Sequence, residues 1–289
     1  MTTEPVPRYA DRLDLGEGPR SVDGRVVLVD IPTGRLLAVP DDPAAPLETV
    51  LRLDVPLGAV APVAGRPGTW IAAADTGICL LTPDGVPTWL ARPEDGSPER
   101  MRMNDGTADP HGRFWAGSMA QDAVVGASSL YRVDPDGTVT RAVTGLTVPN
   151  GPAFTADGTL MYLADSTKGV IRRYPVDPAT GHLGPPQLFA TFTEGLPDGM
   201  TVDMEGALWV ALWGTGAVHR YRADGSRSHL LRLPAVQPAG VCLHGDVLYV
   251  TTARAGLADP GPYDGAVFTV RTAVPGTPAA AYRASPTAV

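Results

Sequence analysis

Short apolar runs separated by turn residues recur along the whole chain. Six of these runs follow a glycine in a turn-like context: DGRVVLVD (23–30), PGTWIAAAD (67–75), HGRFWAGS (111–118), DGTLMYLAD (157–165), EGALWVALW (205–213) and HGDVLYVTT (244–252). A second apolar run often follows, as in GICLLTPDG, SLYRVDPDG and AVFTVR. Short runs bounded by Gly, Pro and Asp predict β-strands that are joined by tight turns.

The glycines that open these runs form a repeat. They are Gly24, Gly68, Gly112, Gly158, Gly206 and Gly245, and neighbouring members lie 39 to 48 residues apart. A period of about 40–45 residues, with roughly four strands in each unit, predicts an all-β six-bladed β-propeller. No linker or change in composition divides the chain, so we expect residues 1–289 to form a single domain. The N-terminal RYADRLDL is expected to add a strand to the last blade and close the ring.

Polar residues recur at one phase of this repeat. The positions eight residues before the turn glycines are Gly16 (followed by Glu17), Val60, Asn104, Asn150, Asp198 and Gln237. Equal phase means equal height at the start of each innermost strand, so these side chains are expected to converge at one mouth of the central channel. One Asn-Gly or Asp-Gly pair alone is typical of a turn. Here, however, the segments LGEGPR, RMNDG, VPNGP and LPDGM fall in register around one axis.

Three of these side chains carry the oxygen atoms that hard divalent cations require, namely Glu17, Asn150 and Asp198. Two carboxylates and one amide oxygen leave coordination positions open for water and substrate, as a catalytic metal needs. The pattern therefore predicts a metal site at the mouth of the channel. The five histidines have no paired spacing, which argues against a histidine-ligated zinc site.

Composition and charge mainly restrict the partners. The chain has 33 Gly, 30 Pro and 19% charged residues, a balance that suits many short strands and turns. Its net charge of -8 argues against nucleic acid and anionic membranes as partners. No apolar run approaches the ~18 residues of a membrane span, and the N-terminus lacks the apolar core of a signal peptide. We expect a cytoplasmic protein, a monomer or small homo-oligomer, in which Cys79 and Cys242 are buried free thiols.

Four longer segments contain these polar positions, and together they resemble a known family. The segments LGEGPR, RMNDGTADPHGRFWAGSM, TVPNGPAFTADGTLMYLADS and LPDGMTVDMEGALWVALWG are similar, in this order, to the defining segments of the senescence marker protein-30 (regucalcin)/gluconolactonase family. The stretches ALWG and TTARAGL resemble the bacterial sugar-lactonase branch, which includes gluconolactonases and xylonolactonases. The resemblance covers nearly the whole chain and implies a six-bladed propeller.

The resemblance also implies roles for individual residues. It assigns one divalent metal ion to Glu17, Asn150 and Asp198, and substrate binding to Arg102 and Asn104. The ion implied is calcium, zinc, manganese, magnesium or iron(II).

The chain departs from the family pattern at several places. An acidic residue that helps to bind sugar hydroxyls maps near Asp122, and Gln121 stands where many relatives are acidic. The family's tryptophan after GEGP is Ser21 here, with Arg20 before it. These departures, together with the apolar Val60, bear on the substrate more than on the chemistry.

The function predicted from these residues is metal-dependent hydrolysis of a sugar lactone, an aldonolactone such as gluconolactone or xylonolactone. The cation would polarise the lactone carbonyl while water attacks it. Asp198 is the expected base that takes the proton from the water, with Asp105 in reserve. Arg102 offers a fork of donors for substrate oxygens, and Asn104 can both donate and accept.

Two other functions stay open. The first is a non-catalytic propeller that binds calcium or another metal, and the second is a specialised hydrolase or cyclase of secondary metabolism that reuses the same site. Arg102 and Asn104 beside the metal would be superfluous in a protein that only binds the ion.

Overall fold

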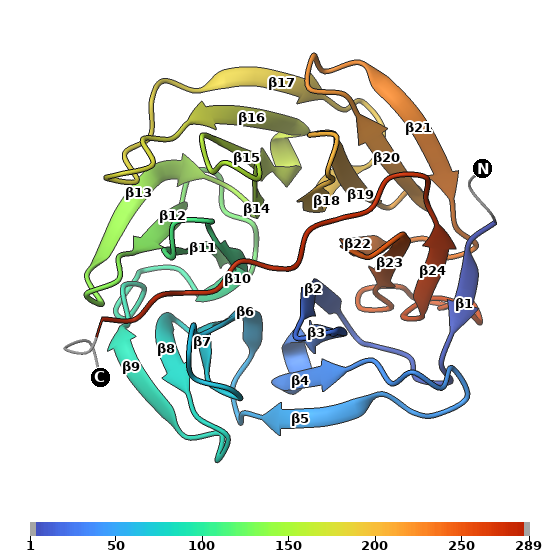
Figure 1. Ribbon diagram of the computed structural model, residues 1–289, viewed down its shortest axis with the longest axis horizontal. Coiled ribbons are helices and arrows are strands. Elements are labelled where there is room, and N and C mark those ends of the chain that lie inside the picture. The colour runs from blue at the N-terminus through green and yellow to red at the C-terminus, as the bar shows by residue number, and fades with distance from the viewer. Residues whose placement is uncertain (1–3, 286–289) are drawn as a thin grey trace.

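The computed structural model describes residues 4–285, which form a ring of six four-stranded antiparallel sheets (Figure 1). The predicted six-bladed β-propeller is confirmed. In each of the first five blades the strands follow one another from the channel outward. Among the described residues, no helix has the length and apolar character of a transmembrane segment.

The strands of each blade are short. The first blade contains β2 (Gly16–Val22), β3 (Arg25–Asp30), β4 (Arg35–Ala38) and β5 (Glu48–Arg52), and the second contains β6 (Leu57–Pro62), β7 (Trp70–Ala74), β8 (Gly77–Leu81) and β9 (Pro87–Ala91). The third contains β10 (Met101–Ala108), β11 (Phe114–Ala120), β12 (Ser128–Val133) and β13 (Val139–Leu146), and the fourth contains β14 (Pro149–Phe154), β15 (Leu160–Asp165), β16 (Val170–Pro175) and β17 (Gln187–Thr191). The fifth contains β18 (Leu196–Val202), β19 (Leu208–Trp213), β20 (Ala217–Tyr221) and β21 (Arg227–Arg232), and the sixth contains β22 (Pro238–His244), β23 (Val247–Thr252), β24 (Val267–Arg271) and β1 (Val6–Arg8). Two 3-10 turns, η1 (Ile31–Thr33) and η2 (Ser166–Lys168), follow β3 and β15.

The sixth blade is built from both ends of the chain. β1 pairs antiparallel with β24, and Val6 lies opposite Thr269. The N-terminus therefore adds the expected strand, although this strand overlaps the predicted segment RYADRLDL only at Arg8.

The six turn glycines lie where the repeat predicts them. Each connects the innermost strand of a blade to the second strand, and their φ angles lie between 56° and 90°. This left-handed backbone is readily adopted by glycine, so the residue type that marks the repeat is also the one that the turn requires.

Two tryptophans show the repeat at the level of atoms. Trp115 Nε1 donates to Asp109 Oδ2 at 2.9 Å, and Trp209 Nε1 donates to Asp203 Oδ2 at 2.9 Å. Both indole rings are buried between blades. Each aspartate precedes the turn and so ties that turn to the hydrophobic layer behind it, as expected for core tryptophans.

Residues 272–285, which we call the C-terminal strap, cross one face of the ring after β24 (Figure 1). Ala279 N donates to Ser21 O at 2.8 Å in the first blade. Tyr282 N donates to Pro62 O at 2.8 Å in the second blade, and the fully buried Tyr282 donates its hydroxyl to Asp134 O at 2.9 Å in the third. The strap therefore joins blades that are distant in sequence.

Removing the ring of Tyr282 should loosen this connection. We expect Tyr282→Ala to lower the free energy of unfolding by ~3–5 kcal/mol, because a fully buried aromatic side chain is lost. Tyr282→Phe keeps the ring and loses only the hydrogen bond to Asp134, which is worth ~1 kcal/mol. Urea unfolding of the three proteins measures both values. An alanine variant as stable as the parent would show that the strap does not stabilise the ring.

Candidate active site

A cavity of about 160 Å³ lies at the mouth of the channel where the innermost strands begin. The strap contacts the far ends of β2 and β6, so this cavity opens on the opposite face. The residues that line it are Leu15, Glu17, Arg102, Asn104, Met119, Val148, Asn150, Ser166, Thr167, Leu196, Asp198 and Trp213. The structure thus brings together the three predicted metal ligands, Arg102 and Asn104.

β-Bulges aim these side chains into the channel. The register between the first two strands of a blade shifts between Glu17 and Arg20, between Met103 and Gly106, between Asn150 and Ala153, and between Pro197 and Met200. A bulge bends its strand and redirects the neighbouring side chains. The Asx-Gly pairs of β10, β14 and β18 therefore lie in bulged strands, although such pairs are common in turns.

Two positions of the same phase do not contribute to the cavity. In β6 the register shifts earlier, between Leu57 and Ala59, so Val60 pairs regularly with Ala72 and is buried in the core. Gln237 Nε2 donates to two backbone carbonyls near the end of β23 and is held by them. The polar wall of the mouth consequently comes from blades one, three, four and five.

A chain of hydrogen bonds links Arg102 to Asn150. Arg102 Nη1 donates to Asn104 Oδ1 at 2.8 Å, and Asn104 Nδ2 donates to Asn150 Oδ1 at 3.0 Å. Asn104 Nδ2 also donates to Pro149 O. Asn104 therefore orients its two neighbours, while Nε and Nη2 of Arg102 have no hydrogen-bond partner within residues 4–285.

Ser166 was missed by the sequence analysis. Its Oγ accepts a hydrogen bond from Asn150 Nδ2 at 2.8 Å and donates to Pro197 O at 2.6 Å. This contact fixes the amide of Asn150 with its oxygen away from η2. No local sequence pattern marks the role, because the contact depends on how η2 packs against β14 and β18.

The acidic side chains are buried. Burial, followed by repulsion from the Asp105 carboxylate, raises the pKa of Glu17 to about 8. Burial also raises the pKa of Asp198 well above its ordinary value, and Glu17 and Asp105 add to this shift. Burial lowers the pKa of Arg102, whereas Glu17 and Asp198 oppose that change. Burial is therefore the main cause of the raised pKa of both acidic side chains.

The residues present fit a hard divalent cation. Among the described residues, Asp198 Oδ1 is buried without a hydrogen-bond partner, and Glu17 accepts only a long hydrogen bond of 3.4 Å from Gly18 N. Buried polar atoms are normally paired, so a free carboxylate oxygen points to a missing ligand. No group of three His, Cys, Asp or Glu side chains in the described part of the chain could hold a metal. The predicted set has two carboxylates, and its third oxygen comes from the amide of Asn150.

Two further predicted residues lie apart from the cavity. Asp105 is deeper in the channel, where it accepts hydrogen bonds from Gly106 N, Gly151 N and Arg20. Asp122 is exposed in the turn after β11 and does not line the cavity. The resemblance places a sugar-binding acid at Asp122, and the structure does not bring it to the site.

Part of the cavity wall is apolar. Val148, Leu196 and Trp213 line it together with the predicted metal ligands. Trp213 is the last residue of β19 and is partly exposed, whereas Trp115 and Trp209 are buried in the core. The cavity therefore combines a polar floor with a hydrophobic rim.

Comparison with known proteins gives consistent results. A pentonolactonase of Haloferax volcanii is 37% identical, and the match covers 91% of this chain and 93% of that protein. A 6-deoxy-6-sulfogluconolactonase of Pseudomonas putida is 36% identical over 91% of this chain and 92% of that protein. The crystal structure of regucalcin from Agrobacterium tumefaciens, described as a calcium-binding protein, is 31% identical with a TM-score of 0.87, covering 96% of this chain and 97% of that chain.

The match to a whole family is equally broad. Residues 15–254 match the region that defines SMP-30, gluconolactonase and LRE-like proteins, and this stretch includes every residue that lines the cavity. The chain belongs to the SMP-30/gluconolactonase/LRE-like family.

Proposed function

We propose that this protein is a metal-dependent lactonase that opens a sugar lactone. The observation that carries the proposal is the meeting, in one cavity, of an unpaired Asp198 oxygen and the free donors of Arg102. A pure metal-binding site has no need for the second feature. The lactonase names of two relatives support the same reaction class.

The bound ion would be held by Glu17, Asn150 and Asp198 and would supply Lewis-acid polarisation of the lactone carbonyl. Arg102 binds a substrate oxygen through its free Nε and Nη2 and so orients the ring. Asn104 holds Arg102 in place through the hydrogen bond to Nη1.

Hydrolysis then adds one water molecule across the ester bond. The water oxygen bonds to the carbonyl carbon, the ring C–O bond breaks, and the product is an open hydroxy acid. Asp198 accepts the proton of the water and returns it to the departing ring oxygen. Asp198 suits this role better than Asp105, because both oxygens of Asp105 already accept hydrogen bonds.

The substrate class follows from the charges and the walls. Arg102 is the one cationic side chain among the described residues that line the cavity, and two carboxylates lie beside it. A neutral aldonolactone, such as gluconolactone or xylonolactone, suits this balance better than a phosphorylated one. Trp213 and Leu196 can pack against the C–H face of the ring.

A calcium-binding propeller without turnover is the second candidate. It is favoured by the description of the similar regucalcin structure as a calcium-binding protein. Both candidates need the ion, and only the lactonase needs Arg102 for its function.

Removing Asp198 should remove the ion. We expect Asp198→Ala to fold and to lose most of the divalent metal that the parent binds, because it deletes a carboxylate ligand. Metal analysis after dialysis measures the content, and Asp224→Ala, in an exposed turn, is the control. Unchanged occupancy in the folded Asp198 variant would exclude this residue from the metal site. Lactone hydrolysis should stop in chelator and return when metal is restored.

Removing Arg102 separates the two candidates. We expect Arg102→Ala to keep the metal content of the parent and to lower kcat/KM for lactones by about 30- to 150-fold, the loss of ~2–3 kcal/mol from a charge-assisted hydrogen bond. Arg102→Lys should recover little activity, since an ammonium group cannot reproduce the planar fork. A pH-indicator assay on a set of aldonolactones measures the rates. Equal rates for parent and Arg102→Ala would contradict this role, and metal binding without any turnover by the parent would favour the binding protein.

A further inference from the structure

The side chain of Arg20 crosses the channel beneath the candidate metal site. It comes from β2, three residues after Glu17, and is 9% exposed. Its Nη2 donates to Gly106 O at 2.6 Å and to Asp105 Oδ1 at 3.3 Å, both on β10. Arg20 therefore connects the strand that carries Glu17 to the strand that carries Asn104.

Asp105 extends this connection to a third strand. Its Oδ2 accepts a hydrogen bond from Gly151 N at 3.0 Å on β14, directly after Asn150. Its Oδ1 also accepts from Gly106 N at 2.8 Å. The contacts of Arg20 and Asp105 thus fall within one or two residues of Asn104 and Asn150, inside the bulges that aim these side chains.

Arg20 also supplies positive charge to the acidic cluster. Glu17, Asp105 and Asp198 are all buried, and Arg102 lines the cavity at the mouth together with Glu17 and Asp198. On the other side of the channel a second cavity of about 220 Å³ opens, and Arg20 is the one charged residue among the described residues that line it. On the side of the channel away from the metal-site mouth, Arg20 is therefore the residue that supplies positive charge to these acidic side chains.

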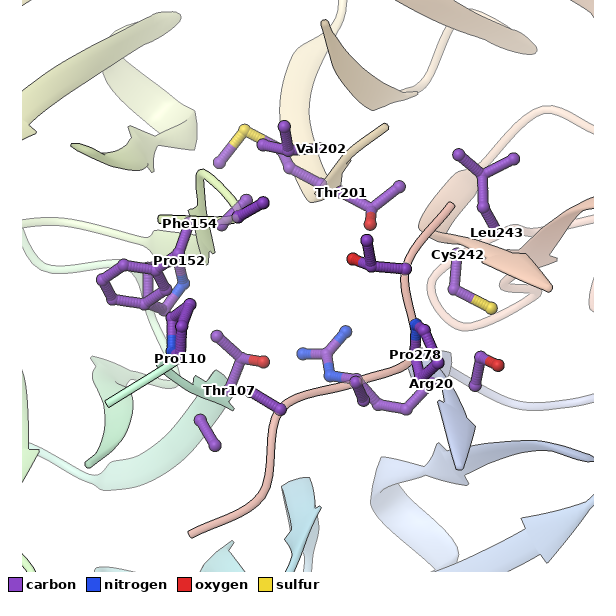
Figure 2. A pocket seen from close by; sticks show the side chains of 18 of the residues that line it. Arg20, Thr107, Pro110, Pro152, Phe154, Thr201, Val202, Cys242, Leu243 and Pro278 are labelled. Carbon is purple, nitrogen blue, oxygen red and sulfur yellow. The ribbon is translucent and has the colours of Figure 1, made fainter. Parts of the chain in front are cut away.

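The second cavity also makes Arg20 reachable from solvent. Figure 2 shows its guanidinium pointing into the cavity, which is bounded by Thr107, Thr201 and Pro278 of the strap. Arg20 Nε is buried and finds no hydrogen-bond partner in the described part of the chain. Ser21, at the position where the family resemblance puts a tryptophan, lines the same space. A small cation entering here could take the place of a missing guanidinium.

We propose that Arg20 is a positioning residue for the metal site. By holding Asp105 and Gly106, it sets the spacing of β2, β10 and β14 and balances the charge below the ligands. The proposal rests on the metal-binding part of the proposed function and does not depend on lactone turnover. The alternative is that Arg20 only stabilises the fold, as other buried arginines do.

Arg220 provides a matched control for that alternative. It is 6% exposed and donates to Asp203 Oδ2 at 2.8 Å, so it forms a similarly buried ion pair. This pair belongs to the turn and outer part of the fifth blade and contacts none of the site residues. Both Arg220→Met and Arg20→Met keep an aliphatic stem and leave a buried carboxylate, Asp203 or Asp105, without its arginine partner. Arg220→Met also removes a contact to the exposed Glu205.

The test is metal titration of these variants by calorimetry, beside their thermal unfolding. We expect Arg20→Met to bind the divalent ion roughly 10- to 100-fold more weakly than the parent, as when residues that orient metal ligands are lost. Arg220→Met should lower the melting temperature and keep the affinity of the parent. Arg20→Lys keeps the charge and cannot contact both Asp105 and Gly106, so its affinity for the ion should lie between that of Arg20→Met and that of the parent.

If Arg20→Met proves too unstable to titrate, Arg20→Lys takes its place in the comparison with Arg220→Met, and a rescue experiment adds a second measurement. In Arg20→Ala, methylguanidinium at millimolar concentration should restore part of the metal affinity through the second cavity, and it should not change the affinity of the parent. The proposal is overturned if Arg20→Met binds the ion as tightly as Arg220→Met at an equal loss of stability, or if the parent binds no divalent ion. A parent and variants that bind metal as expected while hydrolysing no lactone would leave the positioning role standing and refute only the lactonase.

Discussion

Closure of the ring is the constraint on which the candidate site depends. β1 pairs with β24, and Leu13 N donates to Gly265 O at 2.8 Å, so the last blade combines both ends of the chain. Only a closed ring brings the starts of β2, β10, β14 and β18 around one axis, since the residues that line the polar wall come from four different blades. The strap adds a second connection across the opposite face, and the two mouths of the channel consequently differ.

The candidate site contains acidic side chains whose burial destabilises their charged form. A buried charge without a partner destabilises a protein, and the raised pKa of Glu17, to about 8, is the local sign of that effect. Backbone N–H groups of Gly106 and Gly151 and the guanidinium of Arg20 offset part of it at Asp105. Asp198 Oδ1 receives no such contact from residues 4–285, which is why the proposed metal site is centred on this residue.

Interactions elsewhere in the ring have to offset the stability that is lost by burying these acidic side chains. The buried pairs Asp109–Trp115 and Asp203–Trp209 hold the turns of blades three and five to the core behind them. None of these four residues lines the cavity. They hold the inner strands in position although the acidic side chains of the site repel one another. The ends of β10 and β18 next to the turns thus stabilise the fold, whereas their opposite ends carry residues of the candidate site.

The periodicity of the turn glycines was enough to predict the propeller, because the strands of a blade pair mostly with their neighbours in sequence. The same phase also brought Glu17, Asn104, Asn150 and Asp198 to one cavity. It could not separate Val60 from them, because the position of a bulge depends on the hydrogen bonds between two strands. The roles of Ser166, Arg20 and the strap could likewise not be predicted from the sequence, since their contacts join residues from different blades. Local pattern determined the repeat, and only closure of the ring decided which side chains face one another.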